Sequence, residues 1–223
     1  MSAFLAPVHY WLYNKIRGVI EREQFIFKAA AENLCGGTAE EARSQAWQSY
    51  GEPLPETDLQ EQIDHSNIHG WLQRQINVAE SREAAFIQAL VDNCGDAAIE
   101  VAQTAFREHG VHAARHADAQ GKYETSTAPG IYKAINDYYL NGMPCDQADA
   151  ILDSTADKLV WENAGCLQEP NWKRTGADSK IMKKLYNEWL AAFVNILNPG
   201  FVFNQTTDIQ AGDKSNRYEI VRV

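Results

Sequence analysis

Apolar residues recur at helical spacing through most of the first 141 positions. The first run extends from Val8 to Leu34 and stops at the pair Gly36-Gly37, a common signal for the end of a helix. Thr38 followed by Glu41 has the spacing of a capping box for a second helix. The pattern predicts helices over about 8–34, 39–50, 58–93, 96–117 and 129–141, and we expect Gly70 to interrupt the third.

The period changes after Gly142. Ile151-Leu152 and Leu159-Val160-Trp161 predict two short strands, and a strong helical run follows over about 178–197. Residues alternate again from Phe201, and a turn at 211–214 predicts a closing β-hairpin. We therefore predict an α+β fold, with a mostly helical N-terminal two-thirds and a small antiparallel sheet in the C-terminal third. The whole chain, 1–223, is read as one domain, with a helical region over about 8–141 and the sheet plus long helix over about 148–223.

The composition narrows the class of partner. Lys and Arg total 20 against 30 Asp and Glu, so the formal charge is −10, and this balance argues against nucleic acid or an anionic membrane surface as a partner. The sequence contains neither a run of 18 apolar residues nor the features of a secretory signal. The four cysteines are widely spaced, which favours reduced thiols. We expect a cytoplasmic protein that meets a small-molecule ligand, and the pattern leaves a homo-oligomer open.

Histidine pairs raise the question of a metal ion. His65 and His69 have the i,i+4 spacing that puts two ligands on one helix face, as do His112 and His116. The sequence has no HExxH motif and no ExxH pair. A His/Cys metal protein therefore remains a third alternative, with His65 and His69 as the candidate ligands and no firm cofactor.

Two of the cysteines are candidate nucleophiles. Cys145 lies in a turn and Cys166 follows a predicted strand, where thiols are more accessible than inside helices. For each, the more frequent role of such a thiol is that of a small buried apolar residue. Cys35 and Cys94 are predicted at the C-terminal ends of helices, where the helix dipole disfavours a thiolate.

Aromatic residues indicate a cavity. Tyr139, Trp161 and Trp172 come from separate segments and, together with Asn67, are the candidate substrate-binding residues of an aromatic-lined pocket. The sequence contains no P-loop, GxGxxG or GxSxG motif. Nucleotide-binding and serine-hydrolase functions therefore lose support.

The C-terminal third carries an order of features that resembles a known family. Trp161 is followed by Gly165-Cys166, Trp172, a long helix, Asn198-Pro199-Gly200 and a hairpin with Gly212-Asp213. Over roughly 155–223 this arrangement is similar to the L-2-amino-thiazoline-4-carboxylic acid hydrolase family, and to small-ligand-binding domains of the vinyl-reductase type. The family usually has cysteines in the long helix and in the last strand. Here these segments read 184–187 and 214–218 without cysteine, and only Cys166 matches.

The resemblance implies a hydrolase that opens a small cyclic amidine of the thiazoline type. Cys166 would be the nucleophile or a ligand, Cys145 a substitute for a missing family cysteine, and His69 the group that moves the proton. The missing cysteines favour the alternative, a binding or sensor domain without catalysis that encloses a small molecule in an aromatic-lined cavity.

Overall fold

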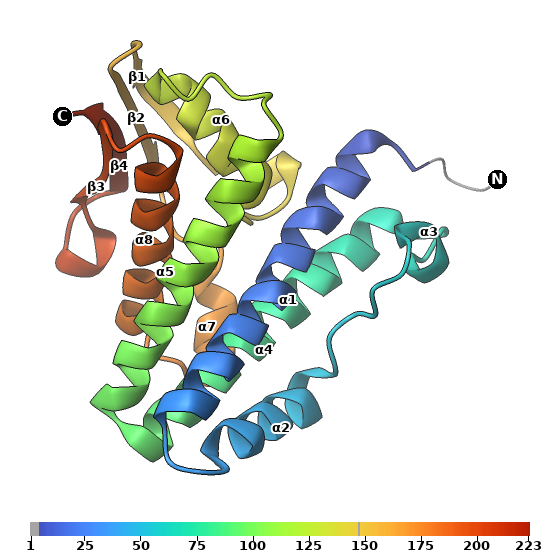
Figure 1. Cartoon of the computed structure of the whole chain (residues 1–223). Coiled ribbons are helices and arrows are strands. Elements are labelled where there is room, and N and C mark those ends of the chain that lie inside the picture. The colour runs from blue at the N-terminus through green and yellow to red at the C-terminus, as the bar shows by residue number, and fades with distance from the viewer. Residues whose placement is uncertain (1–4, 147) are drawn as a thin grey trace.

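The computed structural model describes residues 5–146 and 148–223 and confirms the α+β fold. Over these residues the chain forms eight α-helices and four strands (Figure 1). The helices are α1 (Pro7–Asn33), α2 (Thr38–Tyr50), α3 (Leu59–Gln62), α4 (Ile68–Cys94), α5 (Asp96–Ala119), α6 (Ala128–Tyr138), α7 (Glu169–Thr175) and α8 (Ser179–Leu197). The strands are β1 (Ala150–Ser154), β2 (Lys158–Asn163), β3 (Phe201–Thr207) and β4 (Asn216–Arg222). No helix in this part of the chain is both long and apolar enough for a membrane span.

The strands form one antiparallel sheet in the order β1-β2-β4-β3. The predicted hairpin is confirmed as β3 and β4, and the two short strands predicted before the long helix are β1 and β2. Helix α8 lies between the sheet and α5 (Figure 1), because one face of α8 buries Leu185, Trp189 and Phe193. The main apolar core therefore joins the sheet to the long helices.

A second apolar cluster fixes the N-terminal half of α1 against α4. Leu12, Ile16, Leu72 and Ile76 are at most 2% exposed and form its centre. Chain segments that are far apart in sequence thus meet along α1, which is an element that lines the groove described below.

Buried ion pairs also connect α1 and α4. The Arg22 guanidinium contacts the Glu83 carboxylate with Nε 2.7 Å from Oε1, and the Arg82 Nε lies 2.8 Å from Oε2 of Glu23. All four side chains are at most 5% exposed. Such pairs are costly to bury unless they are fully matched, so they constrain how the two helices meet.

The break near Gly70 differs from the prediction. Helix α4 begins at Ile68, and the chain between 63 and 67 forms the interruption instead. The Asn67 side chain accepts a hydrogen bond from the Gly70 amide at 3.0 Å, which caps the new helix. A Cβ on Gly70 would lie 2.3 Å from the Asn67 side chain, so the glycine makes room for the cap.

Two local predictions were also incomplete. The capping box of Thr38 and Glu41 does not form, because Gly37 occupies the N-cap and no side chain caps α2. Helix α7 was missed, since seven residues are too few for a periodic signal. Its boundary signals were present, however, as Pro170 in its first turn and Gly176 at its end.

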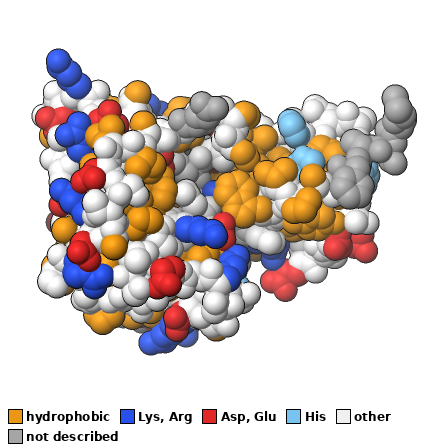
Figure 2. Space-filling model, turned by 90° about the horizontal axis from the view of Figure 1, so that it is seen from above, with side chains coloured by type: hydrophobic (Ala, Val, Ile, Leu, Met, Phe, Trp, Pro, Cys, Tyr) orange, Lys and Arg blue, Asp and Glu red, His pale blue; other side chains and the backbone are white. Residues whose placement is uncertain are grey.

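The surface carries both signs of charge. Figure 2 shows Lys and Arg side chains intermixed with Asp and Glu side chains on the face seen from above, with hydrophobic side chains between them. On that face the charges therefore do not form a field of one sign.

Candidate functional site

Four of the predicted site residues converge. Cys166 lies in the loop between β2 and α7, and it lines an interior cavity together with Tyr139, Trp161 and Trp172. The sequence prediction of an aromatic-lined cavity thus corresponds to a feature of the structure. The volume of this cavity is about 40 Å³. Pockets that enclose organic ligands usually measure roughly 300–1,000 Å³, so this cavity holds only a few water-sized molecules.

The environment of Cys166 disfavours a thiolate. Burial raises the pKa of its thiol to about 12. The thiol donates to Oε1 of Gln168 at 3.0 Å, and no histidine lines the described part of this cavity. A thiol in this state is a poor nucleophile, since the thiolate is the reactive form.

Three other predicted site residues lie elsewhere. Cys145 is exposed in a short 3-10 helix, His69 is in the first turn of α4, and Asn67 caps that helix. None of the three lines the cavity of Cys166. The structure therefore does not bring these three candidates together with Cys166, and the sequence carried no information on their tertiary contacts.

The predicted metal pair is not on one helix. His65 lies in the turn before α4, where its Nε2 is 3.1 Å from the Gln60 carbonyl. His69 instead faces His9, with 3.4 Å between their Nε2 atoms. Within residues 5–146 and 148–223, no three His, Cys, Asp or Glu side chains are grouped so that they could hold a metal ion.

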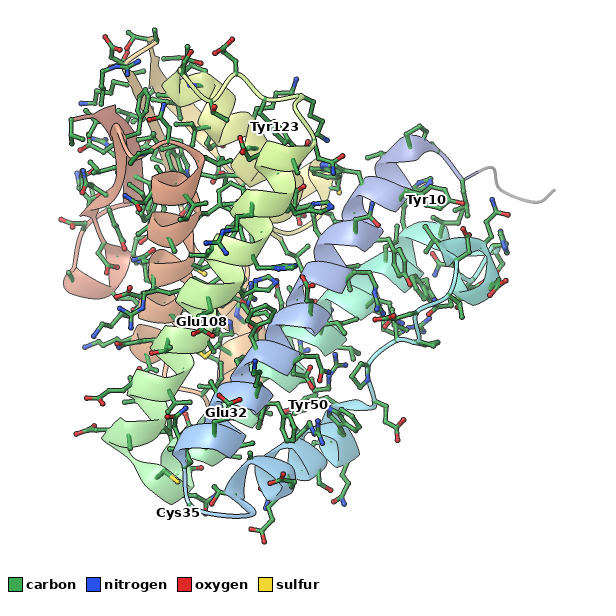
Figure 3. All side chains as sticks on the ribbon, viewed as in Figure 1. Tyr10, Glu32, Cys35, Tyr50, Glu108 and Tyr123 are labelled. Atoms are coloured by element: carbon green, nitrogen blue, oxygen red, sulfur yellow. The ribbon has the colours of Figure 1, made fainter. Side chains whose placement is uncertain are left out.

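The discounted thiols are remote from these features. Cys35 lies in the connection between α1 and α2, at the opposite end of α1 from Tyr10 (Figure 3). It is exposed, and Cys94 is the last residue of α4.

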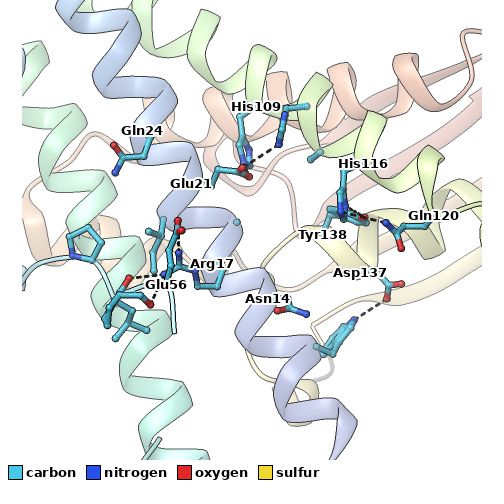
Figure 4. A pocket seen from close by; sticks show the side chains of 18 of the residues that line it. Asn14, Arg17, Glu21, Gln24, Glu56, His109, His116, Gln120, Asp137 and Tyr138 are labelled. Carbon is cyan, nitrogen blue, oxygen red and sulfur yellow. Dashed lines mark hydrogen bonds and ion pairs between the residues drawn. The ribbon is translucent and has the colours of Figure 1, made fainter. Parts of the chain in front are cut away.

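A groove of about 780 Å³ lies between α1 and α5. The segment 53–56 closes one side of the groove. The loop before α6 and α6 itself close another side (Figure 4). Asn14, Arg17, Glu21 and Gln24 face it from α1, because their spacing puts them on one side of the helix. We call this cleft the α1–α5 groove.

Glu21 joins two histidines of α5 at the groove. Its Oε2 lies 3.2 Å from Nε2 of His109, and its Oε1 lies 3.2 Å from Nε2 of His112. The Trp189 indole donates to Nδ1 of His109 at 2.8 Å, so the proton of neutral His109 is on Nε2, toward Glu21. The hydrogen bond from His109 lowers the pKa of Glu21, and burial lowers the pKa of His109.

This chain of hydrogen bonds gives His112 a defined orientation. If His112 donates from Nε2 to Glu21, its Nδ1 is left as a proton acceptor. The His112 side chain is 53% exposed, whereas that of His109 is 3% exposed. His112 is thus the member of the pair that a ligand can reach.

The other end of the groove is organised by Asp137. Its carboxylate accepts hydrogen bonds from Tyr123 at 2.7 Å and from the Trp11 indole at 2.9 Å, and it pairs with Lys122 at 3.1 Å. Burial acts to raise the pKa of Asp137, but these hydrogen bonds outweigh it and the pKa is lowered. Burial, followed by the bond to Asp137, raises the pKa of Tyr123.

Arg17 holds the segment 53–56 against α1. Its guanidinium donates to the carbonyl oxygens of Leu54 at 2.6 Å and Pro55 at 3.2 Å, and it pairs with Glu56 at 3.3 Å. This wall of the α1–α5 groove therefore depends on one side chain of α1.

The sequence prediction missed the α1–α5 groove, although its signals were present. His109, His112 and His116 have i, i+3, i+7 spacing on one helix face, and Asn14, Arg17, Glu21 and Gln24 form a similar polar stripe. What the sequence did not indicate is that these two stripes face one another.

Comparisons with protein-family models, curated protein sequences and solved structures found no match to this chain. The resemblance of roughly 155–223 to the thiazoline hydrolase family therefore stays a prediction.

Proposed function

We propose that the protein binds a small organic molecule in the α1–α5 groove. The observation that carries this proposal is the volume of about 780 Å³, which lies in the range of ligand pockets, combined with polar side chains that converge from α1, α5 and α6. The groove also collects side chains with perturbed pKa values, which is typical of functional sites.

The charges of the groove favour a neutral, zwitterionic or basic ring compound. Its two cationic side chains, Arg17 and Lys122, already contact carboxylates. Three carboxylates line the groove, those of Glu21, Glu56 and Asp137. A phosphorylated or strongly anionic ligand would find no unpaired cation among these residues.

A second candidate function is hydrolysis, and the Glu21–His112 pair favours it. A carboxylate that orients an accessible imidazole is the usual arrangement of a general base. In this proposal His112 accepts a proton from water as the water oxygen attacks the carbon between sulfur and nitrogen of a thiazoline-type ring. The C–S bond then breaks, and the departing sulfur takes the proton back from His112 as the free thiol. This places the hydrolytic group in the groove and gives Cys166 no role as nucleophile.

We propose the cytoplasm as the location of the protein. None of the four cysteines forms a disulfide, and free thiols are usual in a reducing compartment.

Binding is tested with 2-aminothiazoline, a small basic ring. We expect a saturable change in the NMR signal of the Trp11 indole N–H, because Trp11 lines the groove. Asn14→Phe places a ring in the groove and should weaken binding at least about tenfold, the equivalent of one 1.4 kcal/mol step. Asn33→Phe, at the exposed end of the same helix, is the matched control and should bind as the wild type does.

The outcomes separate the two candidate functions. Absence of a saturable change with this and related neutral or basic rings would contradict the groove as a ligand site. Hydrolysis is followed by thiol release from 2-amino-thiazoline-4-carboxylate. If it occurs, His112→Gln should lower the rate by about 10²-fold or more, while Cys166→Ala leaves it unchanged. If only Cys166→Ala lost activity, Cys166 in the interior cavity would be the nucleophile and His112 would not be the catalytic base.

A further inference from the structure

Lys15 is a buried lysine that lacks a charged partner in contact. The residue is 3% exposed, and its Nζ lies 3.9 Å from the centre of the Trp11 ring. Across residues 5–146 and 148–223, no ion pair or hydrogen bond involves this ammonium group. A buried lysine without such a partner is costly to keep charged.

A cleft of about 220 Å³ adjoins this amine. Lys15 lines it together with Trp11, Tyr132, Asn141 and Asp149. The cleft is separate from the α1–α5 groove, although Trp11 contributes to both. Its volume suits a molecule of a few carbon and oxygen atoms.

Burial makes the amine of Lys15 easier to deprotonate. It lowers the pKa of Lys15 to about 8, against the opposing effect of Asp137 and Asp149. About a tenth of the amine is then neutral at pH 7, compared with less than about one part in a thousand for an ordinary lysine. A desolvated lysine of this kind is the usual source of a nucleophilic amine.

Asp149 is held in a fixed position in the same cleft. Its carboxylate accepts hydrogen bonds from the Tyr132 hydroxyl at 3.0 Å and from the amides of Asn141 and Asn163 at 3.2 Å each. It forms no direct contact with Lys15 among the hydrogen bonds and ion pairs of the described residues. It is therefore placed to exchange protons with a molecule in the cleft and does not neutralise the lysine by pairing.

A second buried lysine shows the contrast. Lys183 is 5% exposed, but its Nζ lies 2.5 Å from Oδ1 of Asp208 and 2.6 Å from Oδ1 of Asn216. The Asp208 carboxylate and the Asn216 amide oxygen occupy the nitrogen of Lys183. The two lysines share burial and differ in their partners.

From these contacts we propose that Lys15 is a nucleophilic amine that condenses reversibly with a small uncharged aldehyde or ketone in this cleft. The neutral amine attacks the carbonyl carbon, so that a C–N bond forms and the carbonyl oxygen takes a proton. The nitrogen gives up both of its protons in turn, the oxygen takes a second proton, the C–O bond breaks, and water leaves as the C=N bond of the imine forms. Asp149 accepts and returns protons in these steps, and the condensation needs no oxidant or reductant.

The nearby carboxylates define the charge of the carbonyl compound. Asp137 and Asp149 both act electrostatically on the Lys15 charge. They repel a carboxylate-bearing keto acid, whereas hydroxyl groups of an uncharged compound can bond to Asn141 and Tyr132. This proposal goes beyond ligand binding in the groove and rests on Lys15 and Asp149, neither of which lines that groove.

Reductive trapping tests the proposal. The wild-type protein is treated with hydroxyacetone and cyanoborohydride at pH 7, and the rate of modification of each lysine is followed by peptide mass spectrometry. We expect Lys15 to react at least about tenfold faster than exposed Lys28, because more of its amine is neutral. Lys183 should react more slowly than either. The same reaction in denaturant should remove the differences, which verifies that all three peptides are detected equally.

Because the labelling uses only the wild-type protein, the test of Lys15 does not depend on whether a variant folds. A Lys15 rate equal to or below that of Lys28 overturns the proposal. Equal, fast labelling of Lys15 and Lys183 also overturns it, because burial alone would then explain the reaction. Selective labelling of Lys15 that falls when pyruvate replaces hydroxyacetone at equal intrinsic reactivity, measured on Lys28, supports both the amine and the charge of its substrate.

Discussion

Two buried glutamates of α4, three positions apart, differ in the charge of their contact partners. Glu83 is paired with Arg22 and also accepts a hydrogen bond from the Tyr186 hydroxyl at 2.8 Å. Among the residues that the structure describes, Glu80 has no cationic partner in contact, and its Oε2 accepts a hydrogen bond from Asn171 at 2.7 Å. Burial raises the pKa of Glu80 from 4.5 to about 8, and the nearby Glu83 adds to this, while Asn171 opposes it.

The raised pKa of Glu80 links stability to pH. Between 4.5 and about 8 the folded chain keeps a proton on Glu80 that the unfolded chain has lost. The contribution of this group to the free energy of unfolding is therefore greatest below 4.5 and falls as the pH rises toward about 8.

We predict that Glu80→Gln removes this decrease in the free energy of unfolding with rising pH. The variant should unfold at higher denaturant concentration than the wild type at pH 8, by at least about 1 kcal/mol, with a smaller difference at pH 5. Glu83→Gln is the matched control and should destabilise by about 3–5 kcal/mol, because it leaves the Arg22 charge buried without its partner. Equal destabilisation by both substitutions would mean that Glu80 is ionised in the folded chain.

At the scale of elements, the contact between α5 and α8 depends on one glycine. A Cβ on Gly110 would lie 2.7 Å from the Trp189 carbonyl oxygen and 3.3 Å from Cβ of Ala192. The helices approach closely at this point, and the same approach brings the Trp189 indole to His109. Gly18 of α1 offers a contrast, since its Cβ would meet no atom closer than 3.9 Å.

We therefore predict opposite effects of two glycine-to-alanine substitutions inside helices. Gly110→Ala should destabilise the protein by about 1–3 kcal/mol, because α8 must move to admit the methyl group. Gly18→Ala should stabilise it by up to about 1 kcal/mol through helix propensity. Urea denaturation followed by circular dichroism measures both. A stabilising Gly110→Ala would show that α5 and α8 are less closely packed than described.

The elements themselves were largely predictable, since they depend on local patterns. The long helices and the hairpin follow from apolar periodicity and from turn residues such as Pro199 and Gly200. The break before α4 was placed wrongly because a glycine is a less specific signal than a capping asparagine. Asn67 and Gly70 act together there, and the sequence pattern drew attention only to the glycine.

At the scale of the whole molecule, the sequence indicated candidate site residues but not which of them lie close together in space. Cys166, Tyr139, Trp161 and Trp172 were selected separately, and they do meet at one cavity. His69 and Cys145 were selected by the same kind of reasoning and lie elsewhere. The α1–α5 groove was missed because the residues that line it from α1 and from α5 are more than 80 positions apart, and no local pattern encodes their contact.

The two ion pairs between α1 and α4 have a consequence for how the chain folds. The pairing is reciprocal, since an Arg-Glu dipeptide of α1 meets an Arg-Glu dipeptide of α4 in reversed order. If one helix slipped by a turn, four buried charges would lose their partners, at a cost of several kcal/mol each. The pairs thereby penalise compact states in which the two helices are out of register.

We predict that replacement of Arg22, Glu23, Arg82 and Glu83 by methionine gives a stable helical protein in which α1 and α4 can pack in more than one register. The wild type has six tryptophans and should give at most six indole N–H signals in NMR. The fourfold variant should give more than six, from several coexisting packings. A single set of six signals would show that apolar packing alone fixes the alignment. On this view the two ion pairs contribute less to the stability of the folded chain than to the high free energy of compact states in which α1 and α4 are out of register.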